Sequence, residues 1–138
     1  MDDTLKSLAE KFREEPFAKL FGIDLVELDF GRALVKMEVK EEMMNLFGMA
    51  HGGAVFSLMD AAFELAANSY GTVAVALSMS VNYISPALVG KTIYAEAREV
   101  SKSSRISTYD LEIKSREGEL IASCQAMAYR KKDKLPFL

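Results

Sequence analysis

The sequence is poor in the residues that hold small domains together through covalent or metal cross-links. Among 138 residues it has one cysteine, Cys124, and one histidine, His51. A lone cysteine excludes an internal disulfide and favours a reducing compartment. One cysteine and one histidine cannot form the usual four-ligand zinc site within a single chain. We therefore expect no bound metal and a fold stabilised by its hydrophobic core.

The chain also lacks a strong excess of charge and a long apolar run. Lysine plus arginine number 17 and aspartate plus glutamate number 20, a formal net charge of -3. Contact with nucleic acid needs a dense basic face, and the only compact basic cluster, Arg130-Lys131-Lys132, predicts a solvated tail. The longest apolar region, residues 73–89, is interrupted by serines, an asparagine and a proline, so it is too short and too polar to span a bilayer. We expect no nucleic-acid or membrane partner.

The N-terminus, Met1-Asp2-Asp3-Thr4, is acidic and is not followed by an apolar run. Because a secretory signal peptide needs a basic segment and then an apolar one, we expect none. Together with the single cysteine, this predicts a cytoplasmic protein. The length fits one domain, residues 1–138.

The periodicity of apolar residues divides the chain into helices and strands. Helical spacing over residues 1–22 ends at Gly22, a plausible C-cap. From residue 23 to residue 40 the period changes to two, which predicts two strands joined by a turn at Gly31. Four further strand-like segments follow the central part of the chain, at residues 73–84, 92–100, 105–115 and 120–130.

A long helix is predicted between the two groups of strands, over residues 51–70. It is apolar around nearly its whole circumference, and such a helix must be buried. One buried helix and six short strands predict an α+β fold, with an antiparallel sheet of about six strands wrapped around one long central helix. This arrangement is the hotdog fold.

Four polar side chains within this helix share one side. Ser57, Asp60, Glu64 and Asn68, here called the polar row, are spaced 3, 4 and 4 residues apart and so fall within one narrow wedge. The row could be a solvent-facing stripe, or it could line an active-site cleft or a subunit interface. Composition does not decide between these interpretations.

The helix begins at His51-Gly52-Gly53, and its first turn offers a second candidate site. Glycines permit close approach of a ligand, and first-turn N–H groups point outward with the positive end of the helix dipole. This arrangement can hold a phosphate or the oxyanion that forms when a carbonyl is attacked. The alternative is that the glycines only relieve crowding where the loop joins the helix.

A set of motifs between about Phe17 and Tyr129 resembles the hotdog acyl-CoA thioesterases of the phenylacetic acid degradation (PaaI-like) family. The motifs are Asn45, His51-Gly52-Gly53, Ser57-Leu58-Met59-Asp60-Ala61-Ala62-Phe63, Asn68-Ser69, Tyr83-Ile84-Ser85-Pro86-Ala87 and Tyr109-Asp110-Leu111-Glu112-Ile113. The stretch from His51 to Asp60 is the most specific of them.

The resemblance implies a role for each matching position. Asp60 would be the catalytic carboxylate, as general base or nucleophile, and Asn45 and His51 would orient the thioester. The amides of Gly52 and Gly53 would form the oxyanion hole. The acyl-CoA substrate, often an aryl-acyl one, would be hydrolysed without a cofactor by a homotetramer built from dimers.

Further positions are candidates for substrate contact. Some relatives carry a serine on the strand after the helix, and that position falls at Ala76 here, with Ser78 two residues on. The substrate-binding candidates are Phe47, Met49, Phe56, Ser57, Glu64 and Ser78. Cys124 could act as a nucleophile with His51 as its base, but its alternating strand context predicts a small core residue instead.

The spacing along the helix bears on assembly. Gly52 and Asp60 are eight residues apart, about 12 Å along the axis, whereas the oxyanion donor and the attacking group must both reach one carbonyl. We therefore expect a homodimer with shared active sites. Two other functions stay open, a hotdog acyl-thioester hydratase or dehydratase and a non-catalytic acyl-CoA-binding module.

Overall fold

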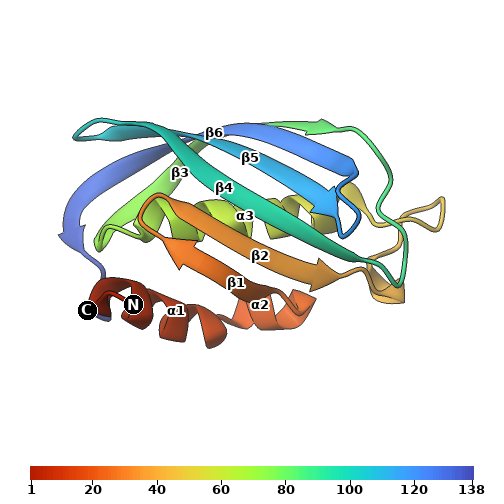
Figure 1. Ribbon diagram of the computed structural model, residues 1–138, viewed down its shortest axis with the longest axis horizontal. Coiled ribbons are helices and arrows are strands. Elements are labelled where there is room, and N and C mark those ends of the chain that lie inside the picture. Colours follow the sequence, from red (N-terminus) through yellow and green to blue (C-terminus); the bar gives the residue numbers. More distant parts are fainter.

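The computed structural model describes all residues from Met1 to Leu138 (Figure 1). Two short helices come first, α1 (Asp3–Arg13) and α2 (Pro16–Phe21). They are followed by β1 (Asp24–Asp29), β2 (Arg32–Glu38), a 3-10 turn (Glu41–Met43) and the long helix α3 (Gly52–Asn68). The last four strands are β3 (Thr72–Tyr83), β4 (Thr92–Lys102), β5 (Ile106–Ser115) and β6 (Leu120–Lys134).

The six strands form one sheet in the order β1-β2-β4-β5-β6-β3, and every neighbouring pair is antiparallel. Helix α3 lies along one face of this curved sheet and packs on β2, β4 and β3 (Figure 1). The predicted α+β architecture, an antiparallel sheet of six strands around one long central helix, is confirmed.

The core lies between α3 and the sheet. Along β2 and β4 every second side chain points inward, and Val35, Met37, Ile93, Ala95 and Ala97 are almost fully buried. The small alanines allow the helix to approach the strands closely. From α3, bulky side chains such as Leu58 fill the remaining space, and burying one of this size stabilises the fold by roughly 1.5–3 kcal/mol.

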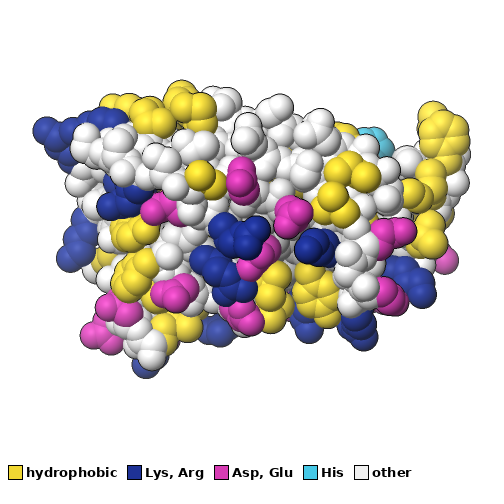
Figure 2. All heavy atoms as spheres, turned by 45° about the horizontal axis from the view of Figure 1, so that its top comes forward, with side chains coloured by type: hydrophobic (Ala, Val, Ile, Leu, Met, Phe, Trp, Pro, Cys, Tyr) yellow, Lys and Arg dark blue, Asp and Glu magenta, His cyan; other side chains and the backbone are white.

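The outer face of the sheet is polar. Arg32 forms ion pairs with Glu27 and Glu96, each at 2.7 Å, and Arg98 and Lys114 lie near Glu112. In Figure 2, basic and acidic side chains alternate across this region. Because these ion pairs lie at the surface, each contributes little to the stability of the fold. They show that this face of the sheet contacts water.

The N-terminal segment packs on β1, the edge strand at one side of the sheet (Figure 1). Helix α1 begins at a cap in which the Asp2 carboxylate accepts from Thr4 N–H at 2.8 Å, and it buries Leu8 and Phe12 among others. Helix α2 ends at Gly22, whose φ of 69° is the left-handed conformation that glycine adopts without strain. The opposite edge strand, β3, has exposed side chains along most of its length.

One prediction about the C-terminal region is wrong. The cluster Arg130-Lys131-Lys132 is not a tail but part of β6, which continues to Lys134 because it pairs with the start of β3; Lys131 and Lys132 are solvent-exposed as expected, and Arg130 is not. Arg130 is only 7% exposed, and its guanidinium carbon lies 5.3 Å from the ring centre of Tyr70. Charge alone gave no sign of this pairing.

Two further features concern membranes and metals. None of the helices is long and apolar enough to cross a bilayer. No group of three or more His, Cys, Asp or Glu side chains has a geometry that could hold a metal ion.

Candidate active site

The polar row on α3 divides into an outer pair and an inner pair. Ser57 and Asn68, the outer pair, are buried and satisfied within the chain. The Ser57 hydroxyl donates to the carbonyl of Gly53 at 2.7 Å. Asn68 donates to the carbonyls of Glu64 at 2.9 Å and Ala74 at 3.1 Å, and accepts from Ala74 N–H at 2.8 Å. Asn68 therefore fastens the end of α3 to the start of β3.

The carboxyls of the inner pair, Asp60 and Glu64, accept no hydrogen bond from a backbone N–H or a basic side chain, and Glu64 has only a hydrogen-bond contact with another acid, Glu15. Asp60 is half-buried and lies near the middle of α3. A third carboxylate, that of Glu15, reaches them from the junction between α1 and α2. The three acidic side chains, here called the carboxylate cluster, form the most unusual electrostatic feature of the molecule.

Crowding in the carboxylate cluster changes the proton affinity of its members. Burial raises the pKa of Asp60, and the charge of Glu15 raises it further. Burial is also the largest cause that raises the pKa of Glu64, to about 8, followed by a hydrogen-bond contact with Glu15 and by the charges of Glu15 and Asp60. Although Glu64 as a residue is exposed, its carboxyl lies close enough to protein atoms to lose hydration. Like charges at short range favour a proton held on one member of the group.

The helix start is organised by His51. Its side chain is the N-cap of α3, and its Nδ1 accepts from Gly53 N–H at 2.8 Å. The Gly53 N–H therefore already has a hydrogen-bond partner. Gly52 is the first residue of α3, so no earlier helical carbonyl can accept from its N–H, which stays available to a ligand. A Cβ on Gly53 would lie 3.1 Å from His51 Nδ1, so this glycine also relieves crowding, as the simpler interpretation held.

Asn45 braces the loop before the helix. Its side-chain oxygen accepts from the N–H groups of Phe47 at 2.8 Å and Met49 at 3.1 Å. This leaves Phe47 80% exposed, next to the still more exposed Leu46. Apolar side chains project from this end of the molecule in Figure 2.

Residues of the loop and the helix start line one cavity. Its volume is about 370 Å³, and Asn45, Met49, Gly52 and Tyr83 contribute to its wall. The Tyr83 hydroxyl lies 3.4 Å from the carbonyl of Gly52. Asp60 does not line this cavity, so a single chain brings together the loop asparagine and a helix-start glycine but not the carboxylate.

The remaining candidate substrate-binding and catalytic residues lie on helix α3 and on strands β3 and β6. Phe56 is half-buried on α3, and Ser78 and Ala76 are exposed on the edge strand β3. Cys124 is buried in β6 and its pKa is raised, mainly by burial. A buried thiol of raised pKa is a poor nucleophile, which agrees with the prediction of a core residue.

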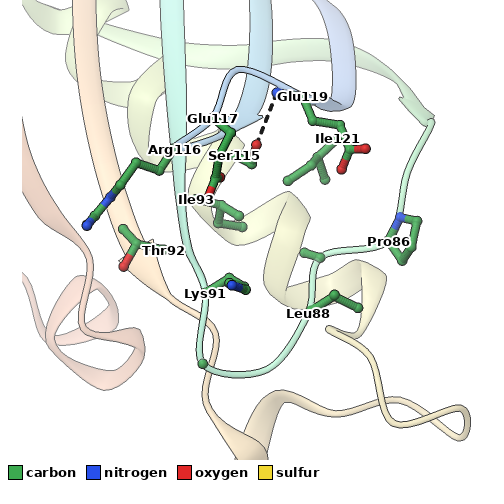
Figure 3. A pocket seen from close by; sticks show the side chains of 12 residues that line it. Pro86, Leu88, Lys91, Thr92, Ile93, Ser115, Arg116, Glu117, Glu119 and Ile121 are labelled. Atoms are coloured by element: carbon green, nitrogen blue, oxygen red, sulfur yellow. Dashed lines mark hydrogen bonds between the residues drawn. The ribbon is translucent and has the colours of Figure 1, made fainter.

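A second cavity adjoins the one at the helix start. It has a volume of about 520 Å³ and lies between the β3–β4 connection and the β5–β6 turn (Figure 3). Pro86, Ala87 and Ile121 line both cavities. The cavity is surrounded by the basic side chains of Lys91 and Arg116 and by acidic side chains from the turn. None of the candidate catalytic residues lines it.

Glu15 belongs to the carboxylate cluster but to none of the sequence motifs. It precedes Pro16 in a helical segment with no motif, and it lies 45 residues before Asp60 in the chain. Only the packing of the N-terminal segment brings it to α3. No local pattern could have identified it.

Comparison with known proteins points to one family. The family model described as the thioesterase superfamily matches residues 47–122. The acyl-coenzyme A thioesterase PaaI of Escherichia coli is 34% identical over 119 residues, which cover 86% of this chain and 85% of that protein. Its solved structure superposes with a TM-score of 0.91 at 30% identity and covers 95% of both chains.

Two other solved structures are similar. A mutant of the phenylacetic acid degradation protein PaaI from Thermus thermophilus gives a TM-score of 0.82 at 38% identity, over 85% of this chain and 100% of that one. The protein smu.793 of Streptococcus mutans UA159, solved with bound acetyl CoA, gives 0.78 at 26% identity, over 82% and 91% of the two chains.

Proposed function

This chain belongs to the thioesterase superfamily and is a thioester hydrolase, and we propose that it cleaves acyl-CoA thioesters, aryl-acyl ones included, at Asp60. The observation that carries the assignment of Asp60 is its state on the helix. It is a half-buried carboxylate without an N–H donor from its own chain, in the middle of a helix that is apolar outside the polar row. Such a group is costly to keep unless it acts on something outside the chain.

The reaction needs a nucleophile, an oxyanion site and a leaving thiolate. As a general base, Asp60 takes a proton from water while the water oxygen bonds to the thioester carbon. The resulting oxyanion accepts hydrogen bonds from the helix-start amides, and Gly52 is the one with a free N–H. The carbon–sulfur bond then breaks, the free acid forms, and the CoA thiolate takes up a proton. As a nucleophile, Asp60 would instead form an anhydride that water hydrolyses.

His51 and Asn45 hold the loop and the helix start in place for this reaction. His51 caps α3, and Asn45 closes the loop that precedes it. Phe47, Met49, Phe56 and Ser78 are the remaining proposed substrate contacts. No bound cofactor is needed, because hydrolysis of a thioester requires only water and acid–base groups.

The active site is shared between two subunits in this proposal. Within one chain, Gly52 and Asp60 are separated by about 12 Å along the helix. Strand β3 offers an exposed edge where a second copy can add its own β3, which would place the two α3 helices antiparallel. The helix start of one subunit then lies near Asp60 of the other. Pairs of such dimers would form a homotetramer, and the lone buried Cys124 supports a reducing, cytoplasmic location.

Thiol release from a panel of acyl-CoAs tests the reaction. Release of CoA thiol with a rate that saturates in acyl-CoA is the expected result. Consumption of an enoyl-CoA without thiol would instead indicate a hydratase, and tight binding without turnover would indicate a binding module.

Complementation tests the shared site. A chain carrying Asp60→Asn is mixed with one carrying Gly53→Phe, under conditions where mass spectrometry shows that subunits exchange. Hybrid dimers should regain about one intact site each, while both parents stay inactive. Verified exchange without returning activity would mean that each site is built within one chain.

A further inference from the structure

A cavity of about 590 Å³ lies beside the carboxylate cluster, between the α1–α2 junction, the C-terminal half of α3 and the C-terminal tail. Its volume is in the range of small-molecule sites, about 300–1,000 Å³. Its wall combines apolar side chains from all three segments with several acidic ones, and it includes Asn68 at the end of α3. None of the motifs found in the sequence involves this combination of segments.

The cavity adjoins the catalytic carboxylate. Glu64 lines it, and Asp60 is four residues away on the same helix, about 6 Å along the axis. Glu15 lines it as well and is close enough to Asp60 and Glu64 for its charge to act on both. The cavity therefore begins about one helical turn from the carboxylate at which the proposed function places the thioester.

The cavity is a better match for the acyl side of the substrate than for the CoA side. Aliphatic and aromatic side chains from three segments, Leu8, Phe12, Leu65, Leu135 and Phe137, make up much of its wall. The ionisable groups around it are the carboxyls of Glu14, Glu15 and Glu64 and the single ammonium of Lys11. Near neutral pH Glu64 keeps its proton most of the time, and the two other carboxylates still outnumber the one ammonium. The phosphates of CoA would meet net repulsion here, and an apolar chain would not.

Resting on the proposed thioesterase activity, we propose that this cavity receives the acyl group and that Glu15 and Glu64 make it select acyl groups without a negative charge at their far end. A carboxylate at that end would add a further negative charge to a group of acids that already crowd one another. In a partly desolvated site this repulsion is much stronger than in water. A methyl group or a ring at the same place meets only apolar walls.

The C-terminal tail closes the far side of the cavity. Leu135 is buried, and its N–H donates to the carbonyl of Gly71 at 2.9 Å, which fixes the tail against the end of α3. Phe137 is half-buried at the wall. Its ring therefore limits how long an acyl chain can be.

A matched pair of substrates tests the charge selection. Hexanoyl-CoA and adipoyl-CoA have the same six-carbon chain and the same thioester, and differ in the terminal carboxylate. We expect kcat/KM for hexanoyl-CoA to exceed that for adipoyl-CoA by about tenfold or more, and Glu15→Gln with Glu64→Gln to reduce this ratio at least about fivefold. Because both substrates use the same Asp60, a change in its reactivity cancels in the ratio.

A control in the N-terminal segment isolates the effect of the cavity. Glu10 lies on the exposed side of α1 and does not line the cavity, so Glu10→Gln should leave the ratio unchanged. An unchanged ratio in the Glu15→Gln, Glu64→Gln variant, with hexanoyl-CoA still hydrolysed, would overturn the assignment of the cavity while the thioesterase activity stands.

Binding gives a second readout that needs no turnover. Calorimetry on the Asp60→Asn chain should show tighter binding of hexanoyl-CoA than of adipoyl-CoA, and equal affinities would overturn the proposal. If the wild-type chain hydrolyses no acyl-CoA but keeps this preference in binding, the proposed function fails and the cavity assignment stands. Phe137→Ala should shift the preferred chain length upward, whereas Leu138→Ala, beside it but outside the cavity, should not.

Discussion

The outer members of the polar row, Ser57 and Asn68, differ from the inner members, Asp60 and Glu64, in where their hydrogen bonds go. The outer side chains are buried and bond to the backbone of their own chain. The inner ones face other acids and accept no hydrogen bond from a backbone N–H or a basic side chain. A polar residue on an apolar helix can therefore be part of the fold or part of a site, and its hydrogen-bond partners distinguish the two.

The largest effect should come from the inner pair. Asp60→Asn is nearly isosteric, so the fold should survive while the base or nucleophile is lost. We expect thiol release to fall by about 10²- to 10⁴-fold, the usual contribution of a positioned general base. Circular dichroism and native mass should match the wild type. A correctly assembled variant with near-normal turnover would show that Asp60 is no more catalytic than the outer pair.

Asn68 should show the opposite behaviour, a loss of stability without a loss of chemistry. Asn68→Ala leaves the buried N–H of Ala74 without its partner, which costs about 1–3 kcal/mol of unfolding free energy. Urea unfolding measures this loss. Asn68 lines the proposed acyl cavity, but its side chain bonds to the backbone of Glu64 and Ala74, so kcat per folded molecule should stay close to wild type while KM can change. The control is Gln125→Ala, at an exposed position on β6, which should be nearly neutral. A stable Asn68→Ala protein with poor turnover would place Asn68 in the site.

These two behaviours show how far sequence could lead. Apolar periodicity was sufficient for the strands and for the buried helix, because the core face of each element repeats locally. Periodicity also placed Asp60 in the polar row, but only the resemblance to the thioesterase family implied the roles of Asp60 and of the helix-start glycines. Spacing could not separate Asn68 from Asp60, since both occupy the same wedge and only the strand opposite Asn68 supplies partners.

Apolar periodicity could not predict features that depend on contacts between residues far apart in the sequence. Glu15 joins Asp60 only when the N-terminal segment docks, and Arg130 is buried only because β6 extends to pair with β3. The hydrogen bond from Gly53 to His51 depends on a side-chain orientation that no motif specifies. The first contact raises the pKa of Asp60, the second buries a charged side chain, and the third occupies an amide that was expected to bind an oxyanion.

A pH-dependent stability should distinguish Glu64 from the outer pair. Its pKa is raised from 4.5 to about 8 in the folded chain, so between these values the folded state holds a proton that the unfolded state releases. The stabilisation is complete below the lower value and is lost as pH rises through the upper one. The melting temperature of the wild type should therefore fall relative to that of Glu64→Gln between about pH 5 and about pH 9. Glu10→Gln should keep the wild-type slope, and parallel curves for wild type and Glu64→Gln would show that Glu64 is ionised like an ordinary surface acid.

The smallest effect is expected at Ser57. This residue tests whether the outer pair belongs to the fold, because it was also a substrate-binding candidate. Its hydroxyl donates back to the carbonyl of Gly53, four residues earlier, and that carbonyl can also accept from the helix backbone. Ser57→Ala removes this bond and improves helix propensity, so the unfolding free energy should change by no more than about 0.5 kcal/mol. Turnover should likewise stay close to wild type, because the side chain is buried and already satisfied. Urea unfolding and thiol release measure both quantities. A loss approaching that of Asp60→Asn would show that Ser57 turns outward to the substrate, as its position among the substrate-binding candidates predicted, and that only Asn68 belongs to the fold.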